Sequence, residues 1–300
     1  MKSIILSTIS SVGRLLRRTP LARSKWLNRV HAAVALALHG SKFADVGPFR
    51  VRLDPRDRFI AKKIVLYGGY ETHEIELLCS LVRPGDHVLD VGANIGLFTL
   101  FLSRAVGPTG RVVAVEPDPD NVALLKENAK ANRCDNVTVV PCALGTEEGV
   151  VNLYQVDENR GNLSLADVGD TGRAVNVTMR RGADVLAELN TRPRVVKIDV
   201  EGAEPMVVRG LGYRPPVMLF EFAPSLLERF DFDPQGFLAD LTADGYRIES
   251  VDPDTGRRQA ITPSAALNGF FRSRQASYNI LATRDDAESL PAGAGQGNRS

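Results

Sequence analysis

Several acidic residues follow an apolar segment in the second half of the chain. The segment RVVKIDVEGAE (194–204) passes from a buried-strand pattern into Asp199, Glu201 and Glu204. Lys197 interrupts the apolar residues, and a charge in a buried strand is costly unless it is paired. Asp199 lies two residues further on, on the same face of the strand, so it is the expected partner of Lys197. A carboxylate placed here can remove the proton of a bound hydroxyl group.

Two interpretations fit this stretch. In the structural one, Lys197 and Asp199 form an ion pair and the following acids stabilise the N-terminus of a helix. In the functional one, Asp199 faces the reacting group with Glu201 beside it, and Lys197 either neutralises Asp199 or holds a substrate oxygen. We favour the functional interpretation, and the two roles of Lys197 stay open. Glu221, in the strand pattern VMLFEFA (217–223), is expected to project into the same cleft.

Asp199, Glu201 and Glu221 are also of the residue type that binds magnesium, because octahedral oxygen ligation suits carboxylates from adjacent strand ends. A metal ion there would lower the pKa of a bound hydroxyl group. The same three residues can equally act as a base with hydrogen-bond partners, so magnesium is an alternative that the sequence does not favour. His73 is a second candidate base, although a single histidine near a helix start more often has a structural role.

A glycine-rich turn follows another apolar segment earlier in the chain. In HVLDVGANIG (87–96) a short strand pattern passes through Gly92 and Gly96 into a helical pattern that begins at Leu97. Such a turn presents backbone N–H groups and the positive end of the helix dipole at one place. Glu116 ends the next strand pattern, 24 residues after Gly92, where a carboxylate can accept hydrogen bonds from both hydroxyls of a ribose. Together these features predict a nucleoside pocket.

A parallel sheet would bring these residues together, because the carboxyl ends of its strands meet at one edge. We predict strands at 87–91, 111–116, 137–144, 194–200, 217–223, from 246 and at 277–284, and helices at 71–82, 97–106, 119–132, 183–189 and 203–211. The last two strands are joined without a helical pattern, so an antiparallel hairpin is expected at the sheet edge. The polar, glycine-rich stretch 158–172 is expected to be an inserted loop between two short strands.

The combination of these motifs resembles the FkbM family of S-adenosylmethionine-dependent methyltransferases. The stretches that carry the resemblance are VLDVGANIGLFTL (88–100), VVAVEPDPDNVALLKEN (112–128), CALGTEEG (142–149) and KIDVEGAE (197–204). It covers roughly 65–284, and MRRGADVL (179–186) departs slightly from the family pattern. It implies an α/β, Rossmann-like fold with a seven-stranded, mostly parallel sheet, a C-terminal antiparallel hairpin and helices on both faces.

The resemblance further implies S-adenosylmethionine as cofactor and methylation of a hydroxyl group on a sugar, glycolipid or secondary metabolite. The residues expected to bind the cofactor are Asp90, Gly92, Asn94 and Gly96 around its methionine part, Glu116 at the ribose, Cys142 and Ala143 at the adenine edge, and Glu71, which closes over it with Tyr70. The residues expected at the reaction are Asp199, Glu201, Lys197 and Glu221. The acceptor is expected to be a small molecule or a hydroxyl linked to a glycan or lipid.

Three other function classes were weighed. A dehydrogenase would show G-x-G-x-x-G, whereas this turn has Asn94 in the middle and the chain ends in a hairpin. A non-catalytic module that only binds the nucleoside would need Glu116 but not the acids after residue 198. An RNA methyltransferase would show a basic face, and the body of this chain has none. The last two stay as alternatives, the RNA enzyme being the less favoured.

The beginning of the chain differs from the rest. Residues 1–40 carry seven basic residues and no acidic one, whereas the whole chain of 300 residues has a net charge of +1, so the remainder is at −6. Apolar residues at helical spacing predict an amphipathic helical extension over 1–44. We favour packing of this extension on the domain or on a second subunit; contact with an anionic membrane surface and, less favoured, organellar targeting are the alternatives.

Composition sets further bounds. A methyltransferase domain is expected over 45–284 and a disordered tail over 285–300. The three cysteines are odd in number and lack C-x-x-C spacing, which argues against disulfides and a cysteine zinc site and favours a reducing compartment. No apolar run approaches the roughly 20 residues of a membrane span. We therefore expect a cytoplasmic protein without a nucleic-acid partner, with peripheral membrane contact through residues 1–40 left open.

Overall fold

The computed structural model describes residues 41–54, 60–156, 163–165, 172–262 and 277–284. Nearly all of the extension expected at 1–44 and the whole of the tail expected at 285–300 therefore lie outside the described residues. The N-terminal hairpin begins at Phe43, slightly before the expected domain boundary. None of the described helices is long and apolar enough to cross a membrane.

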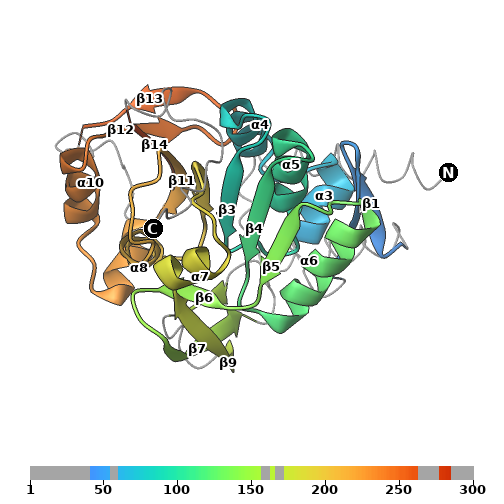
Figure 1. Ribbon diagram of the computed structural model, residues 1–300, viewed down its shortest axis with the longest axis horizontal. Helices are drawn as coiled ribbons and strands as arrows, with labels where there is room; N and C mark the ends of the chain where they lie inside the picture. The colour runs from blue at the N-terminus through green and yellow to red at the C-terminus, as the bar shows by residue number, and fades with distance from the viewer. Residues whose placement is uncertain (1–40, 55–59, 157–162, 166–171, 263–276, 285–300) are drawn as a thin grey trace, which may run out of the picture.

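A mixed sheet runs through the centre of the molecule (Figure 1). Its strands are β3 (His87–Val91), β4 (Arg111–Val115), β5 (Val137–Val140), β10 (Val195–Ile198), β11 (Val217–Phe222), β12 (Tyr246–Val251), β13 (Arg258–Ala260) and β14 (Tyr278–Arg284). Their order is β13-β12-β14-β11-β10-β3-β4-β5. The strands from β11 to β5 are parallel, and β14, β12 and β13 are antiparallel. The predicted sheet and its antiparallel end are confirmed, and the short β13 extends that end.

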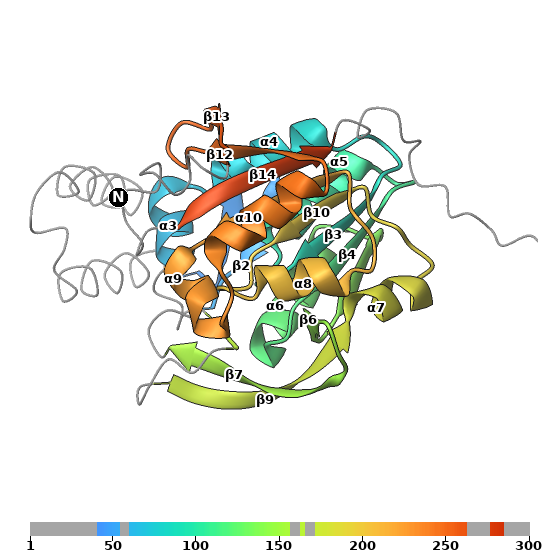
Figure 2. The ribbon, with the colours of Figure 1, turned by 90° about the vertical axis from the view of Figure 1, so that its left-hand side faces the viewer.

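Helices cover both faces of this sheet, as Figure 2 shows. They are α3 (Ile60–Tyr67), α4 (Thr72–Leu81), α5 (Leu97–Val106), α6 (Pro119–Ala131), α7 (Gly182–Glu188), α8 (Glu204–Gly210), α9 (Pro224–Leu227) and α10 (Pro234–Ala243), with a 3₁₀ turn at Glu228–Phe230. Successive strand residues point to opposite faces, so Val88 packs with α3, α4 and α5, whereas Leu89 packs with α7, α8 and α10. Two apolar layers therefore hold the central strands, which are buried on both sides.

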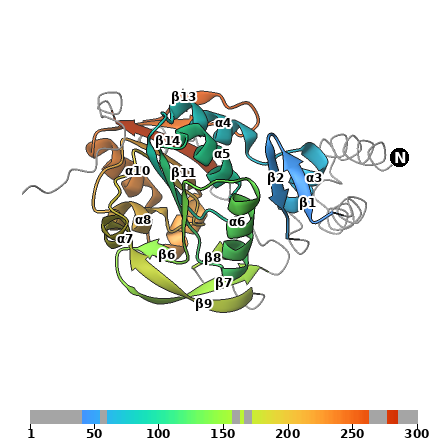
Figure 3. The same ribbon diagram turned by 45° about the vertical axis from the view of Figure 1, so that its right-hand side comes forward.

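The prediction of a single strand at 137–144 was wrong. The chain leaves the main sheet after Val140 and forms β6 (Ala143–Gly145) in a second sheet with β9 (Gly172–Arg181), β7 (Gly149–Val156) and β8 (Leu163–Ser164). This small sheet lies along one side of the molecule (Figure 3). The short β8 pairs with the end of β7 inside the stretch expected to be a loop.

An N-terminal hairpin of β1 (Phe43–Val46) and β2 (Phe49–Arg52) packs beside α6. Asn128 of α6 and Asn132, which caps the C-terminus of that helix, bond to the backbone of β2 as another strand would. The amide of Asn132 bonds to both the N–H and the C=O of Arg50, and that of Asn128 does the same to Arg52. Asn128 also donates to the C=O of Ile95 at 2.8 Å, which ties the hairpin to the glycine-rich turn.

Candidate active site

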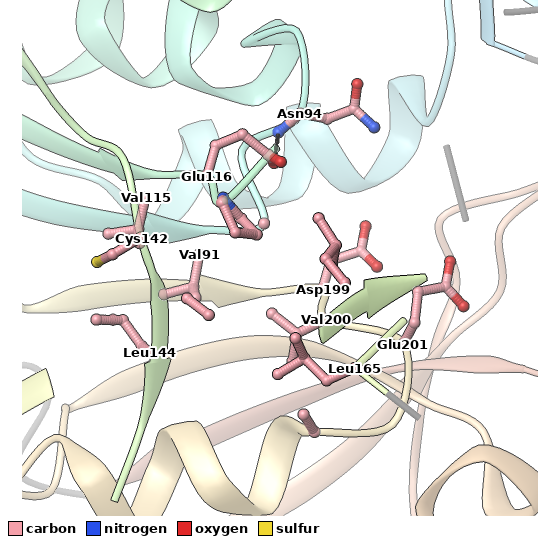
Figure 4. Close-up of a pocket in the computed structure, with 15 residues that line it drawn as sticks. Val91, Asn94, Val115, Glu116, Cys142, Leu144, Leu165, Asp199, Val200 and Glu201 are labelled. Carbon is pink, nitrogen blue, oxygen red and sulfur yellow. Dashed lines mark hydrogen bonds between the residues drawn. The ribbon is translucent and has the colours of Figure 1, made fainter. Parts of the chain in front are cut away.

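Two cavities open at the carboxyl edge of the parallel strands and meet there. The smaller is lined mainly by apolar side chains from β3, β4, β6 and β7 together with Glu116 (Figure 4). The larger, of about 530 Å³, lies under α3 and the start of α4 and carries most of the acidic residues. Both are lined by Gly92, Asn94, Asp199 and Glu201. A ligand that spans both cavities must pass these four residues.

The glycine-rich turn is shaped by backbone contacts. Gly92 has φ +76°, and a Cβ atom there would lie 1.9 Å from the carbonyl oxygen of Asp199. Only glycine therefore lets the ends of β3 and β10 lie this close. Gly96 has φ +91° and is packed against Leu125 of α6, and it lines neither cavity. The predicted turn is present, but these two glycines allow close packing of protein on protein.

Glu116 lies at the end of β4, facing the turn (Figure 4). Its two carboxylate oxygens accept hydrogen bonds from the backbone N–H groups of Asn94 at 2.8 Å and Asp118 at 2.9 Å. Burial, followed by the charge of Asp118, raises the pKa of Glu116 to about 7, against the effect of these hydrogen bonds. Cys142 and Ala143, the residues expected at the adenine edge, line the same small cavity. Leu153 and Leu165, which the sequence analysis missed, also line it.

Asp90 is fully buried beneath the turn and lines neither cavity. Its Oδ2 accepts a hydrogen bond from the hydroxyl of Thr99 in α5 at 2.6 Å, while Oδ1 faces Lys197 Nζ at 4.0 Å. Burial raises the pKa of Asp90, and Lys197 and Thr99 oppose the shift. The structure therefore places Asp90 as a support for the turn and for Lys197.

Lys197 and Asp199 form the ion pair that the sequence predicts. The distance between Lys197 Nζ and Asp199 Oδ2 is 3.1 Å, and the ammonium group also lies 4.7 Å from the centre of the Phe98 ring. Burial disfavours the charge of Lys197, but Asp199, Asp90 and Glu71 outweigh it and raise the pKa of Lys197. Lys197 is buried, whereas the carboxylate of Asp199 is partly open to the cavity.

Glu201 and Glu221 complete the acidic edge. One carboxylate oxygen from each of Asp199, Glu201 and Glu221 lies within 4.8 Å of the others. Burial, followed by the charges of Glu221 and Asp199, raises the pKa of Glu201 to about 10. Burial, followed by Asp199 and Glu204, raises the pKa of Glu221 to about 8. Glu201 also has φ +54°, a left-handed conformation that is uncommon for a residue other than glycine.

Glu71 and Tyr70 line the larger cavity, where Glu71 lies among the residues around Lys197 and Asp199. Burial, followed by the charge of Asp199, raises the pKa of Glu71 to about 7, and burial also raises that of Tyr70. Neither residue lines the smaller cavity. His73 lines neither cavity; its ring lies 3.6 Å from Glu76.

Two further polar residues of the large cavity were missed in the sequence. Glu74 on α4 is buried, and its Oε1 accepts a hydrogen bond at 2.8 Å from the amide of Asn279 on β14. Glu74 falls on an ordinary amphipathic helix, and Asn279 is a polar residue in a strand near the C-terminus. One feature of the sequence points to Glu74: it stands between His73 and Ile75 at a position where the helical pattern predicts an apolar residue.

Comparison with known proteins decides the family. Residues 90–248 match the model of the methyltransferase FkbM domain, which is more than half of the chain. The chain belongs to the FkbM methyltransferase family. The match runs from Asp90 in β3 to Ile248 in β12, so it includes the glycine-rich turn, Glu116 and the acidic edge. It confirms the resemblance read from the motifs, and with it the methyltransferase class and S-adenosylmethionine as cofactor.

Relatives of the FkbM methyltransferase domain support the same family. The chain is 32% identical over 184 residues to the 31-O-demethyl-FK506 methyltransferase FkbM of Streptomyces tacrolimicus, covering 51% of this chain and 68% of that protein. It is 31% identical over 144 residues to methyltransferase 1 of Beauveria bassiana, where the match covers 41% of this chain and only 57% of the relative. A solved O-methyltransferase from Thermotoga maritima is 15% identical with a TM-score of 0.39, covering 75% of this chain and 71% of that one. At that TM-score the likeness adds nothing to the assignment.

The residues present fit the cofactor of the family. A nucleoside needs an apolar slot with a hydrogen-bond acceptor for its ribose, and the small cavity supplies apolar walls with Glu116. A sulfonium carries a positive charge, and the two cavities meet beside Asp199 and Glu201.

Proposed function

We propose that this FkbM methyltransferase transfers a methyl group to a hydroxyl oxygen of a sugar, glycolipid or secondary metabolite. The observation that carries the proposal is the position of Asp199. Its carboxylate lies where the two cavities meet, partly open to the larger one and paired with Lys197. An alcohol must lose its proton during or after it attacks a methyl group, so a base is needed at this place.

Binding and orientation of the cofactor fall to the residues of the smaller cavity. Glu116 accepts hydrogen bonds from the ribose hydroxyls, and the apolar walls formed by Leu144, Leu153 and Leu165 exclude water from the nucleoside. S-adenosylmethionine, when bound, supplies a methyl group that its sulfonium has already activated. Positioning and exclusion of water therefore provide much of the rate, and covalent help from the protein is not needed.

Asp199 is the best candidate for the base among the acids at this edge. Its carboxylate lies 3.1 Å from Lys197 and is partly open to the larger cavity, where it can contact a bound hydroxyl group. Glu201 and Glu221 have pKa values raised to about 10 and about 8, so near neutral pH, without a further cation, both keep their protons. In that form they donate hydrogen bonds to acceptor oxygens. Lys197 acts through Asp199, and as a buried group it does not need to contact the substrate.

The wall of the larger cavity bears on the choice of acceptor. It carries the acids Glu71, Glu74, Asp199, Glu201 and Glu221 and the two lysines Lys63 and Lys197. An acceptor with several hydroxyl groups finds many hydrogen-bond partners there. We therefore expect a hydroxyl-rich acceptor.

The first experiment is calorimetric titration of the protein and of Glu116→Ala with S-adenosylmethionine. We expect binding by the protein and its loss in the variant. Transfer is then measured with cofactor labelled in the methyl group against a panel of sugars, glycolipids and macrocyclic alcohols. We expect label on oxygen, and Asp199→Asn is expected to bind cofactor but to transfer roughly 10²–10⁴-fold more slowly.

A matched control is Glu147→Gln, which alters an exposed acid in the turn before β7 and should transfer like the unaltered protein. Label found on nitrogen, carbon or sulfur would overturn the O-methyl assignment and leave the methyltransferase class intact. Unchanged cofactor binding in Glu116→Ala would show that the ribose lies elsewhere.

A further inference from the structure

Three carboxylates from separate positions in the chain converge at the rim of the larger cavity. Asp199 directly follows β10, Glu201 lies in the loop after it, and Glu221 lies in the neighbouring strand β11. One oxygen from each lies within 4.8 Å of the others. In an octahedral shell with bonds of about 2.1 Å, opposite oxygens lie about 4 Å apart, so small side-chain adjustments suffice to close these three on one ion.

Among the described residues, only one of these three carboxylates has a protein cation beside it. The ammonium group of Lys197 lies 3.1 Å from Asp199 and also faces Asp90 at 4.0 Å. In the part of the chain that the structure describes, no lysine, arginine or histidine nitrogen lies within 4.0 Å of a carboxylate oxygen of Glu201 or Glu221. The ammonium group of Lys197 therefore serves Asp90 and Asp199, and a bound cation would be the partner that Glu201 and Glu221 lack among the described residues.

A buried carboxylate beside the cluster, that of Glu74, also points to a ligand. This residue is 2% exposed, and among the described residues its Oε2 has no hydrogen-bond partner. It lines the larger cavity together with Asp199, Glu201 and Glu221, and a small adjoining pocket together with Asp199 and Glu221. A buried acceptor without a donor is costly, and a water molecule held by a cation is a donor of the kind that Glu74 lacks.

We infer that Asp199, Glu201 and Glu221 bind a divalent cation, of the size of magnesium or manganese, with Glu74 accepting a hydrogen bond from one of its water ligands. The inference rests on the proposed function and extends it. A cation at the rim of the large cavity would hold the acceptor through oxygen atoms and lower the pKa of its hydroxyl. Hard oxygen ligands and the absence of cysteine or histidine in this cluster favour magnesium over zinc.

Binding of manganese to the full chain tests the site, because bound manganese changes the electron paramagnetic resonance signal. The titration is done without cofactor or acceptor, so it does not depend on activity. We expect one bound ion per chain, displaced by magnesium. Glu221→Gln is expected to weaken binding by roughly tenfold or more, and Glu74→Gln by about tenfold, as outer-shell substitutions commonly do.

Glu147→Gln removes the same charge from an exposed turn and is the matched control, expected to bind manganese as the unaltered protein does. Circular dichroism on each variant shows whether its fold is kept. Absence of a stoichiometric site, or equal affinity in Glu221→Gln and Glu147→Gln, overturns the inference. Titration of the same samples with S-adenosylmethionine separates the outcomes, since cofactor binding without manganese binding rejects the cation site and leaves the proposed function standing.

Discussion

At the scale of single residues, the ionisation of Glu116 connects the site to pH. Its pKa is raised to about 7, and a ribose hydroxyl donates more strongly to an ionised carboxylate than to a neutral one. We therefore expect the affinity for S-adenosylmethionine to rise from pH 6 to pH 8 and then level off. Below the pKa the change is at most about tenfold per pH unit. Calorimetric titrations at several pH values measure it.

Glu116→Gln is the comparison for this prediction, because an amide has the same size but does not titrate in this range. Its affinity is expected to be lower and independent of pH. A pH step of equal size in Glu116→Gln would assign the titration to another group, such as Glu71, whose pKa also lies at about 7.

Lys197 supports a second prediction at this scale. Its ammonium group faces both Asp90 and Asp199, and Asp90 is completely buried. Lys197→Met leaves a buried carboxylate without its cation, so the free energy of unfolding should fall by about 3–5 kcal/mol. Adding Asp90→Asn to Lys197→Met should recover part of this loss, because the amide is neutral. Urea unfolding of the two single variants and the double variant gives the coupling energy, and strictly additive effects would contradict the pairing.

At the scale of elements, the sequence predicted β3, β4 and β10 well because each has an apolar run that is followed by a glycine or an acid, namely Gly92, Glu116 and Asp199. The second sheet was harder to predict. Pro141 and Cys142 follow Val140 without a break in the apolar pattern, so nothing local marks the point where the chain leaves the main sheet. The turn at Gly92 was predicted correctly, but the main reason for a glycine there was not. A Cβ atom at this position would meet the backbone of Asp199, which is over a hundred residues away in the sequence.

Some residues of the candidate site could be predicted from the sequence, and others could not. Asp199, Glu201 and Glu221 stand at strand ends, where the order of elements alone brings them together. Glu74 reaches the site only because α4 packs beside β14, and Asn279 approaches it from that strand with a hydrogen bond of 2.8 Å. Such a contact between distant segments depends on tertiary packing and has no signature in a local pattern.

The junction between α6 and the N-terminal hairpin gives a prediction at this scale. Asn128 bonds to Arg52 of β2 and to the C=O of Ile95 in the glycine-rich turn. Asn128→Ala should weaken S-adenosylmethionine binding several-fold and lower the free energy of unfolding by about 1–3 kcal/mol, since it leaves buried backbone groups without partners. Calorimetry and urea unfolding measure the two effects, and hydrogen exchange should show faster exchange in β2.

Asn132→Ala is the matched control, because Asn132 bonds to Arg50 of the hairpin but not to the turn. It should speed hydrogen exchange in β2 while leaving cofactor affinity unchanged. Equal affinity losses in Asn128→Ala and Asn132→Ala would mean that the hairpin as a whole, and not the bond to Ile95, supports the turn.

At the scale of the whole molecule, the fold concentrates buried acids at one edge of the sheet and so links stability to pH. The pKa of Glu221 is about 8 in the folded protein against 4.5 ordinarily, mainly because of burial and then the charges of Asp199 and Glu204. A group whose pKa is raised by folding binds more protons in the folded state. Its contribution to stability is full below pH 4.5 and is lost as the pH rises through about 8.

The melting temperature of the protein, free of cofactor and divalent cations, should therefore fall between about pH 5 and about pH 8. Glu201, with a pKa of about 10, extends the trend to higher pH. Glu221→Gln should be more stable than the unaltered protein at pH 8 but not at pH 5, because the amide cannot ionise. A manganese ion in the proposed site would stabilise the ionised carboxylates and flatten the slope in the unaltered protein only. Scanning calorimetry across this range, with a chelator or with manganese, measures both effects. If the melting temperature falls equally steeply with pH in the unaltered protein and in Glu221→Gln, the ionisation of Glu221 is not the cause of the fall.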